Sequence, residues 1–75
     1  MITYKDATGL IHEEKYDNSI TSIDLSFRNI TQILNISGLT SLQELWLSNN
    51  QITEIKGLDG LTRLQILLLS NNQMT

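Results

Sequence analysis

The chain has 75 residues, which allows one domain at most, and it lacks cysteine, so neither disulfides nor thiolate metal sites support the fold. Eight acidic residues against five scattered basic ones give a net charge of −3, which argues against a nucleic-acid-binding surface. The longest apolar run covers only residues 66–69, far too short to cross a membrane. We therefore expect neither nucleic acid nor a membrane as a partner.

The first 19 residues differ in pattern from the rest of the chain and predict an N-terminal cap. The stretch "DATG", residues 6–9, is typical of a turn between apolar segments, which favours a β-hairpin. A short helix over residues 12–16 is the alternative. In either case the side chains expected to cover the first coil are Ile2, Tyr4, Leu10, Ile11 and Tyr16.

From Ile20 onward the sequence repeats with a period of 22 residues, in two full units (20–41 and 42–63) and a third, incomplete one (64–75). Each unit begins with alternating aliphatic residues, the pattern of a short strand with one buried face. Each full unit then places aliphatic residues three apart, which indicates tight helical or extended turns. A coil of this kind turns its apolar residues inward and must stack on its neighbours.

The ninth position of the second and third units is an asparagine, Asn50 and Asn72. An inward amide can satisfy backbone groups left unpaired where the coil bends, so we predict a ladder of stacked asparagines. The first unit has Arg28 at this position, and arginine has no acceptor and rarely turns inward. We therefore expect an altered bend in the first coil and a ladder that starts in the second.

The segments "LQELWLSNNQITEI" and "LQILLLSNNQM" resemble the leucine-rich repeat signature L-x-x-L-x-L-x-x-N-x-L. The 22-residue period is similar to that of protein phosphatase regulatory subunits and bacterial internalins. The resemblance covers residues 20–75 and implies an α/β-type repeat solenoid. Its short arc would carry parallel strands on the concave face, irregular or 3-10 turns on the convex face and a cap at the N-terminus. It also implies a structural role for Phe27, because phenylalanine is frequent just before the asparagine position.

The strand residues that lie between the buried aliphatic ones are expected on the concave face. Neighbouring coils should align them in two rows, one of Asp24, Trp46 and Leu68 and one of Ser22, Glu44 and Ile66. Trp46, Ile66 and Leu68 would form a contiguous apolar patch, which is typical of an interface. The candidate protein-binding residues are Asp24, Glu44, Trp46, Ile66 and Leu68.

No group of residues indicates catalysis, and we predict neither a metal nor a cofactor. There is one histidine, no cysteine and no glycine-rich phosphate loop, and the adjacent Glu13 and Glu14 beside His12 would point in different directions. The predicted function is non-enzymatic binding of another protein, in a fragment of a longer repeat protein. The lack of a signal peptide and of cysteine favours a cytoplasmic location.

The alternative function is self-association. The third unit lacks a return side, so its strand edge and core side have no cover. A homodimer that joins the two chains tail to tail, with antiparallel final strands, would cover both. The residues predicted at this edge are Leu64, Ile66, Leu67, Leu68, Leu69 and Met74.

Overall fold

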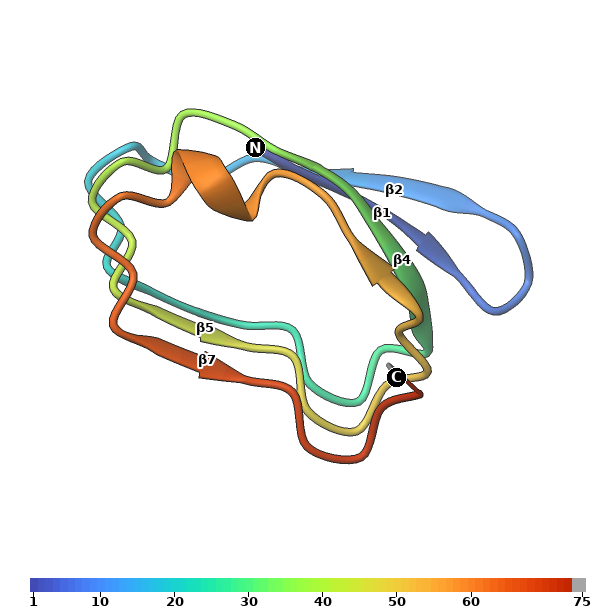
Figure 1. Ribbon diagram of the computed structural model, residues 1–75. Helices are drawn as coiled ribbons and strands as arrows, with labels where there is room; N and C mark the ends of the chain where they lie inside the picture. Colours follow the sequence, from blue (N-terminus) through green and yellow to red (C-terminus); the bar gives the residue numbers. More distant parts are fainter. Residues whose placement is uncertain (74–75) are drawn as a thin grey trace.

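The computed structural model describes residues 1–73. Over this range the chain winds around a single apolar core, with short strands on two opposite sides of the first two coils (Figure 1). The elements in chain order are β1 (Ile2–Asp6), β2 (Ile11–Glu14), β3 (Ser22–Asp24), β4 (Ile30–Ile36), β5 (Glu44–Trp46), β6 (Glu54–Ile55), the 3-10 helix η1 (Leu58–Gly60) and β7 (Ile66–Leu68).

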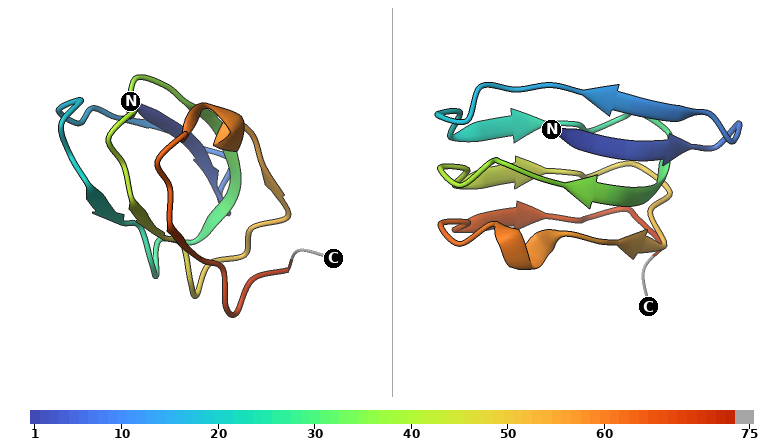
Figure 2. Two further views of the ribbon diagram at one scale, coloured as in Figure 1. Left: turned by 60° about the vertical axis from the view of Figure 1, so that its left-hand side comes forward. Right: turned by 90° about the horizontal axis from the view of Figure 1, so that it is seen from above.

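One side of the coil is a three-stranded parallel sheet with the order β3-β5-β7. Its pairing joins residues that are 22 positions apart, for example Ile23 with Leu45 and Leu45 with Leu67. The middle residue of each strand turns inward, and its two neighbours face away from the core. Figure 2 shows the three strands stacked along the axis of the coil. The period in the sequence is therefore the step from one coil to the next.

The other side carries a four-stranded mixed sheet with the order β2-β1-β4-β6. The expectation of irregular or 3-10 turns on this side is wrong for the first unit, where β4 is a strand of seven residues. The second unit fits the expectation better, because it has only the two-residue β6 followed by η1. The difference arises because β4 has a neighbour, β1, that extends its hydrogen bonding along the whole strand.

The spacing of three in the first unit is explained by irregular pairing between β1 and β4. Ile30, Ile33 and Ile36 are all buried, although a regular strand would turn alternate residues to opposite faces. The register shifts between Thr3 and Tyr4 and again between Lys5 and Asp6. Each shift is a bulge that adds one residue to β4 and restores the inward direction of the next isoleucine.

The N-terminal segment is an antiparallel hairpin of β1 and β2, so a strand occupies positions for which a helix was the alternative. Asp6 stabilises the turn, because its Oδ1 accepts hydrogen bonds from the Thr8 backbone (2.9 Å), the Thr8 hydroxyl (2.6 Å) and the Leu10 backbone (3.1 Å). These donors, together with His12, hold the pKa of the Asp6 carboxyl well below its usual range.

The hairpin contributes to the core with only part of its apolar surface. Ile2 and Tyr4 are buried, and Tyr16 packs partly buried against the core. The expected role of Leu10 and Ile11 is wrong, because they are 62% and 61% exposed. Leu10 comes just before β2 and Ile11 is the first residue of β2, on the edge of the sheet away from β4. The buried apolar core consists of Ile2, Tyr4, Ile23, Leu25, Ile30, Ile33, Ile36, Leu39, Leu42, Leu45, Leu47, Ile52 and Leu61.

Candidate protein-binding face

The outward side chains of the parallel sheet form what we call the β3-β5-β7 face. Strand pairing places Asp24, Trp46 and Leu68 in one row and Ser22, Glu44 and Ile66 in the next. Trp46, Ile66 and Leu68 are 40%, 42% and 37% exposed and lie on the neighbouring strands β5 and β7. The apolar residues are therefore adjacent to one another, on a sheet whose backbone is fixed by hydrogen bonds.

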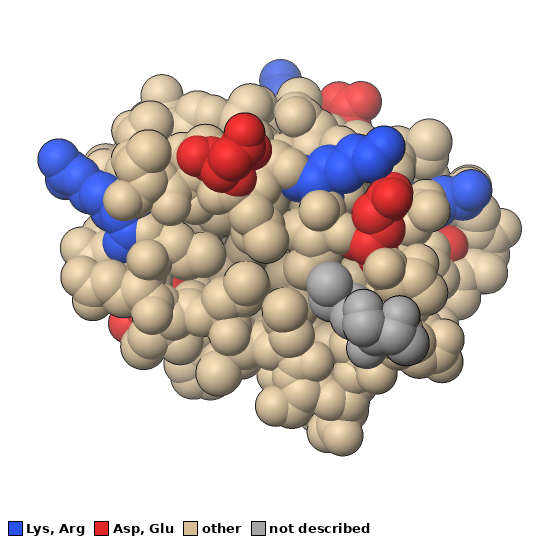
Figure 3. Space-filling model, in the orientation of Figure 1, with Lys and Arg blue, Asp and Glu red and all other residues tan. Residues whose placement is uncertain are grey.

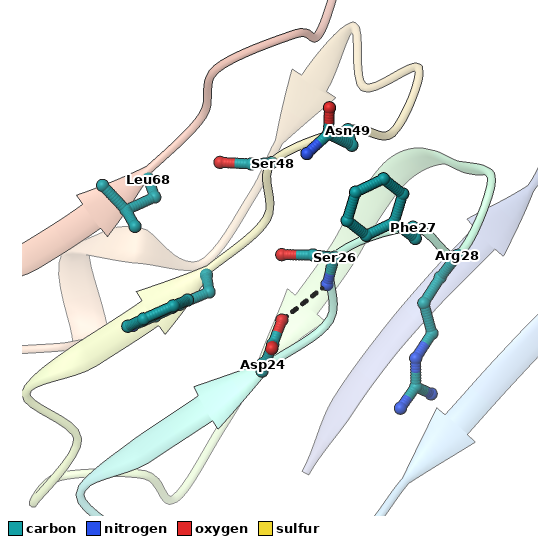
Figure 4. Close-up of a pocket in the computed structure, with 8 residues that line it drawn as sticks. Asp24, Ser26, Phe27, Arg28, Ser48, Asn49 and Leu68 are labelled. Carbon is teal, nitrogen blue, oxygen red and sulfur yellow. Dashed lines mark hydrogen bonds between the residues drawn. The ribbon is translucent and has the colours of Figure 1, made fainter.

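Two carboxylates lie beside Trp46. Asp24 is its direct neighbour across the strand pair, and Glu44 Oε1 accepts a hydrogen bond from the Trp46 indole Nε1 at 3.3 Å. The Asp24 Oδ1 accepts a hydrogen bond from the Ser26 backbone N–H at 2.9 Å (Figure 4). That N–H and the Ser26 hydroxyl lower the pKa of the Asp24 carboxyl, so Asp24 is ionised at neutral pH.

A hollow of about 560 Å³ lies over the end of this face where the strands lead into the asparagine turns. It lies over β3, β5 and β7 and the two turns that follow β3 and β5. The residues that line it are Asp24, Ser26, Phe27, Arg28, Trp46, Ser48, Asn49 and Leu68 (Figure 4).

Phe27 is one of the residues of the hollow that the sequence did not predict as part of a binding site. We expected a structural role, but its side chain is 78% exposed. Its backbone has a positive φ of 59°, as do Asn49 (60°) and Asn71 (59°) at the equivalent positions of the other units. Positive φ is common for asparagine and rare for a bulky residue. In the first unit phenylalanine replaces the asparagine found at this position in the other two units. That replacement was the feature of the sequence that could have indicated an exposed residue with another role.

The asparagine amides satisfy the backbone at the bends. Asn50 is buried, and its Oδ1 accepts hydrogen bonds from the backbone of Arg28 (2.8 Å) and Ile30 (3.1 Å). Its Nδ2 donates to the carbonyls of Leu25 and Leu47, both at 3.0 Å. Asn72 repeats the pattern one coil later, where its Oδ1 accepts from the Ile52 backbone at 3.0 Å. The Asn50 amide of the second coil thus also satisfies backbone groups of the first coil, which has no asparagine at the ladder position.

Arg28 turns outward in the first coil, toward the hairpin. Its Nη1 lies 2.7 Å from Glu14 Oε2, and the hydroxyls of Tyr4 and Tyr16 donate to the same carboxylate, each at 2.9 Å. The bend is altered as expected, because Asn29 has a positive φ of 56° that its counterpart Gln51 lacks. The Glu14 cluster therefore ties the hairpin to the first coil at the place where the ladder has no asparagine.

A model of the leucine-rich repeat family, described as "Leucine Rich repeats (2 copies)", matches residues 16–60 and again residues 40–75. The two matches together cover most of the chain. The chain belongs to the leucine-rich repeat family. No similar protein was found among curated proteins or among solved structures.

Leucine-rich repeats commonly mediate protein–protein interaction and are generally not enzymes. Within residues 1–73, no three His, Cys, Asp or Glu side chains converge as a metal site would require. His12 Nε2 pairs only with Asp6 Oδ2, at 2.7 Å, and its ring stacks on Tyr4. The same part of this repeat protein contains no helix long and apolar enough to cross a membrane.

The third repeat is less buried than the second. Leu64, Leu67 and Leu69 are half-buried, whereas their counterparts Leu42, Leu45 and Leu47 have no exposed surface. In Figure 3 the lower centre of the visible surface shows no charged side chains. Ile66 and Leu68 of β7 border the same surface from the β3-β5-β7 face. Met74, the remaining residue predicted at this edge, lies outside the described residues.

Proposed function

We propose that this leucine-rich repeat chain binds another protein through its β3-β5-β7 face. The observation that carries the proposal is the adjacency of three exposed apolar residues, Trp46, Ile66 and Leu68, on paired strands of a sheet. Exposed apolar residues that are contiguous mark interaction surfaces, and tryptophan is enriched among the residues that dominate binding energy. The sheet fixes their positions before binding, so little conformational entropy is lost on association.

Asp24 and Glu44 are the polar rim of the proposed interface. Both are charged neighbours of Trp46, through strand pairing and through the indole hydrogen bond respectively. Rim charges of this kind steer association and select the partner more than they add affinity. In this proposal Trp46 and Leu68 supply most of the affinity and the two carboxylates supply orientation. We also propose that the chain divides into a cap (1–19) and repeats (20–41, 42–63 and 64–75).

The proposal is tested by affinity capture with the immobilised chain, followed by calorimetric titration of each purified captured protein. We expect Trp46→Ala to weaken binding about tenfold or more, because the central aromatic contact is lost. Ile11→Ala is the matched control, since Ile11 is a large apolar residue of similar or greater exposure on the opposite sheet. Binding that depends on Ile11 and not on Trp46 would overturn the proposal.

A second candidate function is self-association through β7 and the half-buried residues beside it. The contrast between Leu67 and the fully buried Leu45 supports it, because a second copy laid tail to tail would bury Leu64, Leu67 and Leu69. The two β7 strands would then pair antiparallel and join the sheets. Light scattering across a concentration series tests this. We expect the mass to approach that of a dimer at high concentration, and a monomer at every concentration would contradict it.

A further inference from the structure

We infer that the hollow beside Trp46 is a subsite for a basic side chain, arginine or lysine, of the protein partner. The inference rests on the proposed function and adds to it the chemistry of the group that is recognised. It draws on three features of the described residues: exposed aromatic rings, an ionised carboxylate that lines the same hollow, and the pairing of the lining Arg28 with Glu14.

Two aromatic residues line the hollow, Trp46 on β5 and Phe27 in the turn after β3. Phe27 is 78% exposed and Trp46 is 40% exposed, so much of each side chain is available to a ligand. The faces of aromatic rings attract cations through their quadrupole, and tryptophan does so most strongly. Phe27 gains almost no burial within the chain, and its backbone conformation is unfavourable for its size. A ligand that packs against it is therefore the natural use of the ring.

The carboxylate of Asp24 supplies the charge. Asp24 pairs across the sheet with Trp46, precedes Phe27 by three residues and lines the hollow (Figure 4). The Ser26 backbone N–H donates to its Oδ1, and Asp24 is exposed, so its carboxylate remains accessible to a ligand. Ser26 and Ser48 add hydroxyl groups at the same level. A guanidinium or ammonium group could thus meet both a carboxylate and an aromatic ring.

Arg28, the basic residue that lines the hollow, forms an ion pair with Glu14 and not with Asp24, although its charge contributes to the lowered pKa of the Asp24 carboxyl. The Arg28 side chain leads away from Ser26 and toward the hairpin strands, where its Nη1 pairs with Glu14 at 2.7 Å (Figure 4). The strand positions of the β3-β5-β7 face contain two acidic residues, Asp24 and Glu44, and no basic one. The charge of the face therefore complements a cation and disfavours an acidic group, whose carboxylate would lie near Asp24.

The test uses the full chain with two small probes, blocked arginine amide and blocked citrulline amide. Citrulline has nearly the shape of arginine but no charge, so it isolates the contribution of the cation. The chain has one tryptophan and one phenylalanine, so Trp46 fluorescence and the Phe27 ring signals in NMR report on the site without ambiguity. We expect arginine amide to bind about threefold to fivefold more tightly than citrulline amide, and the difference to shrink at high salt.

Two variants give the comparison that decides. Asp24→Asn keeps an oxygen for the Ser26 N–H and removes the charge, so the preference for arginine should disappear. Asp17→Asn is the matched control, because Asp17 makes the same contact with the Ser19 backbone (2.9 Å) and does not line the hollow. It should keep the preference.

Equal binding of the two probes, a preference that survives Asp24→Asn, or no saturable signal with arginine amide would each overturn the subsite. None of these results removes the proposed function, because a partner could bind Trp46 and Leu68 through apolar contacts alone. That function fails separately, when Trp46→Ala leaves the affinity of captured proteins unchanged.

Discussion

Position 27 of the first coil has a backbone conformation suited to asparagine, but phenylalanine occupies it. The φ of Phe27 is 59°, and asparagines occupy the two equivalent positions at nearly the same angle. This left-handed region costs a bulky residue about 1–2 kcal/mol, whereas the short polar side chain of asparagine tolerates it, and an exposed Phe27 recovers little of the cost by burial. We expect Phe27→Asn to raise the free energy of unfolding by about 1 kcal/mol, measured by urea denaturation.

The same substitution should weaken the binding of arginine amide, so that stability and recognition change in opposite directions. Ile11→Asn is the control, because Ile11 is comparably exposed and lies in a strand. It should give no gain in stability, since asparagine is depleted in strands. Loss of stability in Phe27→Asn would mean that the phenyl ring makes stabilising contacts within the chain, and the argument for a recognition role would then fail.

Asn50 should be the polar side chain whose loss is most destabilising. It satisfies two backbone N–H groups and two carbonyls in a buried position, so Asn50→Ala leaves several of them unpaired away from water. We expect a loss of about 3 kcal/mol in the free energy of unfolding. Asn72→Ala should cost about 1 kcal/mol, because Asn72 is only half-buried and water can replace it. Denaturation curves that give equal losses would contradict this account of the ladder.

Tyr16 predicts a loss of stability at alkaline pH. Burial, together with the hydrogen bond to Glu14 and its negative charge, raises the pKa of Tyr16 to about 12. The unfolded chain releases this proton near the ordinary pKa of 10, so between these values the folded state binds more protons than the unfolded state. The free energy of unfolding should therefore fall as the pH rises from about 10 to about 12.

Urea denaturation of the wild type and of Tyr16→Phe across this range measures the effect. The variant should lose less stability than the wild type as the pH rises, although some loss should remain because burial also raises the pKa of Tyr4. Identical slopes for the two proteins would show that Tyr16 ionises in the same range in the folded and unfolded states.

At the scale of elements, the hairpin should stabilise the fold through β1 and not through its exposed tip. Ile2 is 1% exposed and pairs with Ile36 of β4, whereas Leu10 is 62% exposed. We expect Ile2→Ala to lower the free energy of unfolding by about 3 kcal/mol and Leu10→Ala by no more than about 0.5 kcal/mol. Both losses can be measured by denaturation, followed with one spectroscopic probe of the hairpin and one of the repeats. If Ile2→Ala melted the hairpin alone, the hairpin would not belong to the cooperative unit.

The strands differ in how far the sequence predicts them. The parallel sheet follows from the aliphatic alternation and the 22-residue period, which also predict its register, because each coil repeats the same local pattern. β4 was not predicted, because its bulges come from pairing with β1, about 30 residues away, and no local pattern encodes that partner. Propensity and periodicity describe a segment and not its neighbours, so the sheet of the first unit required the structure.

The candidate site shows the same division. Trp46, Ile66 and Leu68 could be placed on one face from their offsets in the repeat. Phe27 could not be placed from the family pattern, which favours a structural role at that position. The outward orientation of Phe27, which is 78% exposed, argues against that role, and its positive φ matches those of Asn49 and Asn71. The hollow depends on that one orientation.

At the scale of the whole molecule, burial falls from the second repeat to the third. Equivalent leucines of the two repeats therefore contribute unequally to the free energy of unfolding. Leu45 is completely buried between β3 and β7, whereas Leu67 on β7 is half-buried. A methyl-rich side chain that still contacts water contributes less, and its removal leaves less of a cavity. In a monomer, Leu45→Ala should therefore cost about 3–4 kcal/mol and Leu67→Ala about 1–2 kcal/mol.

The two candidate functions predict different effects of protein concentration on the stability losses caused by Leu45→Ala and Leu67→Ala. If a second copy covers β7, the loss caused by Leu67→Ala should grow with concentration toward that of Leu45→Ala, because the same side chain is then fully buried and dimerisation is coupled to folding. The loss caused by Leu45→Ala should remain large throughout, since Leu45 is buried within one chain. Denaturation midpoints measured over a broad concentration series give both values. A loss for Leu67→Ala that stays small at every concentration would exclude the copy as the cover of this surface and leave the β3-β5-β7 face as the site of recognition.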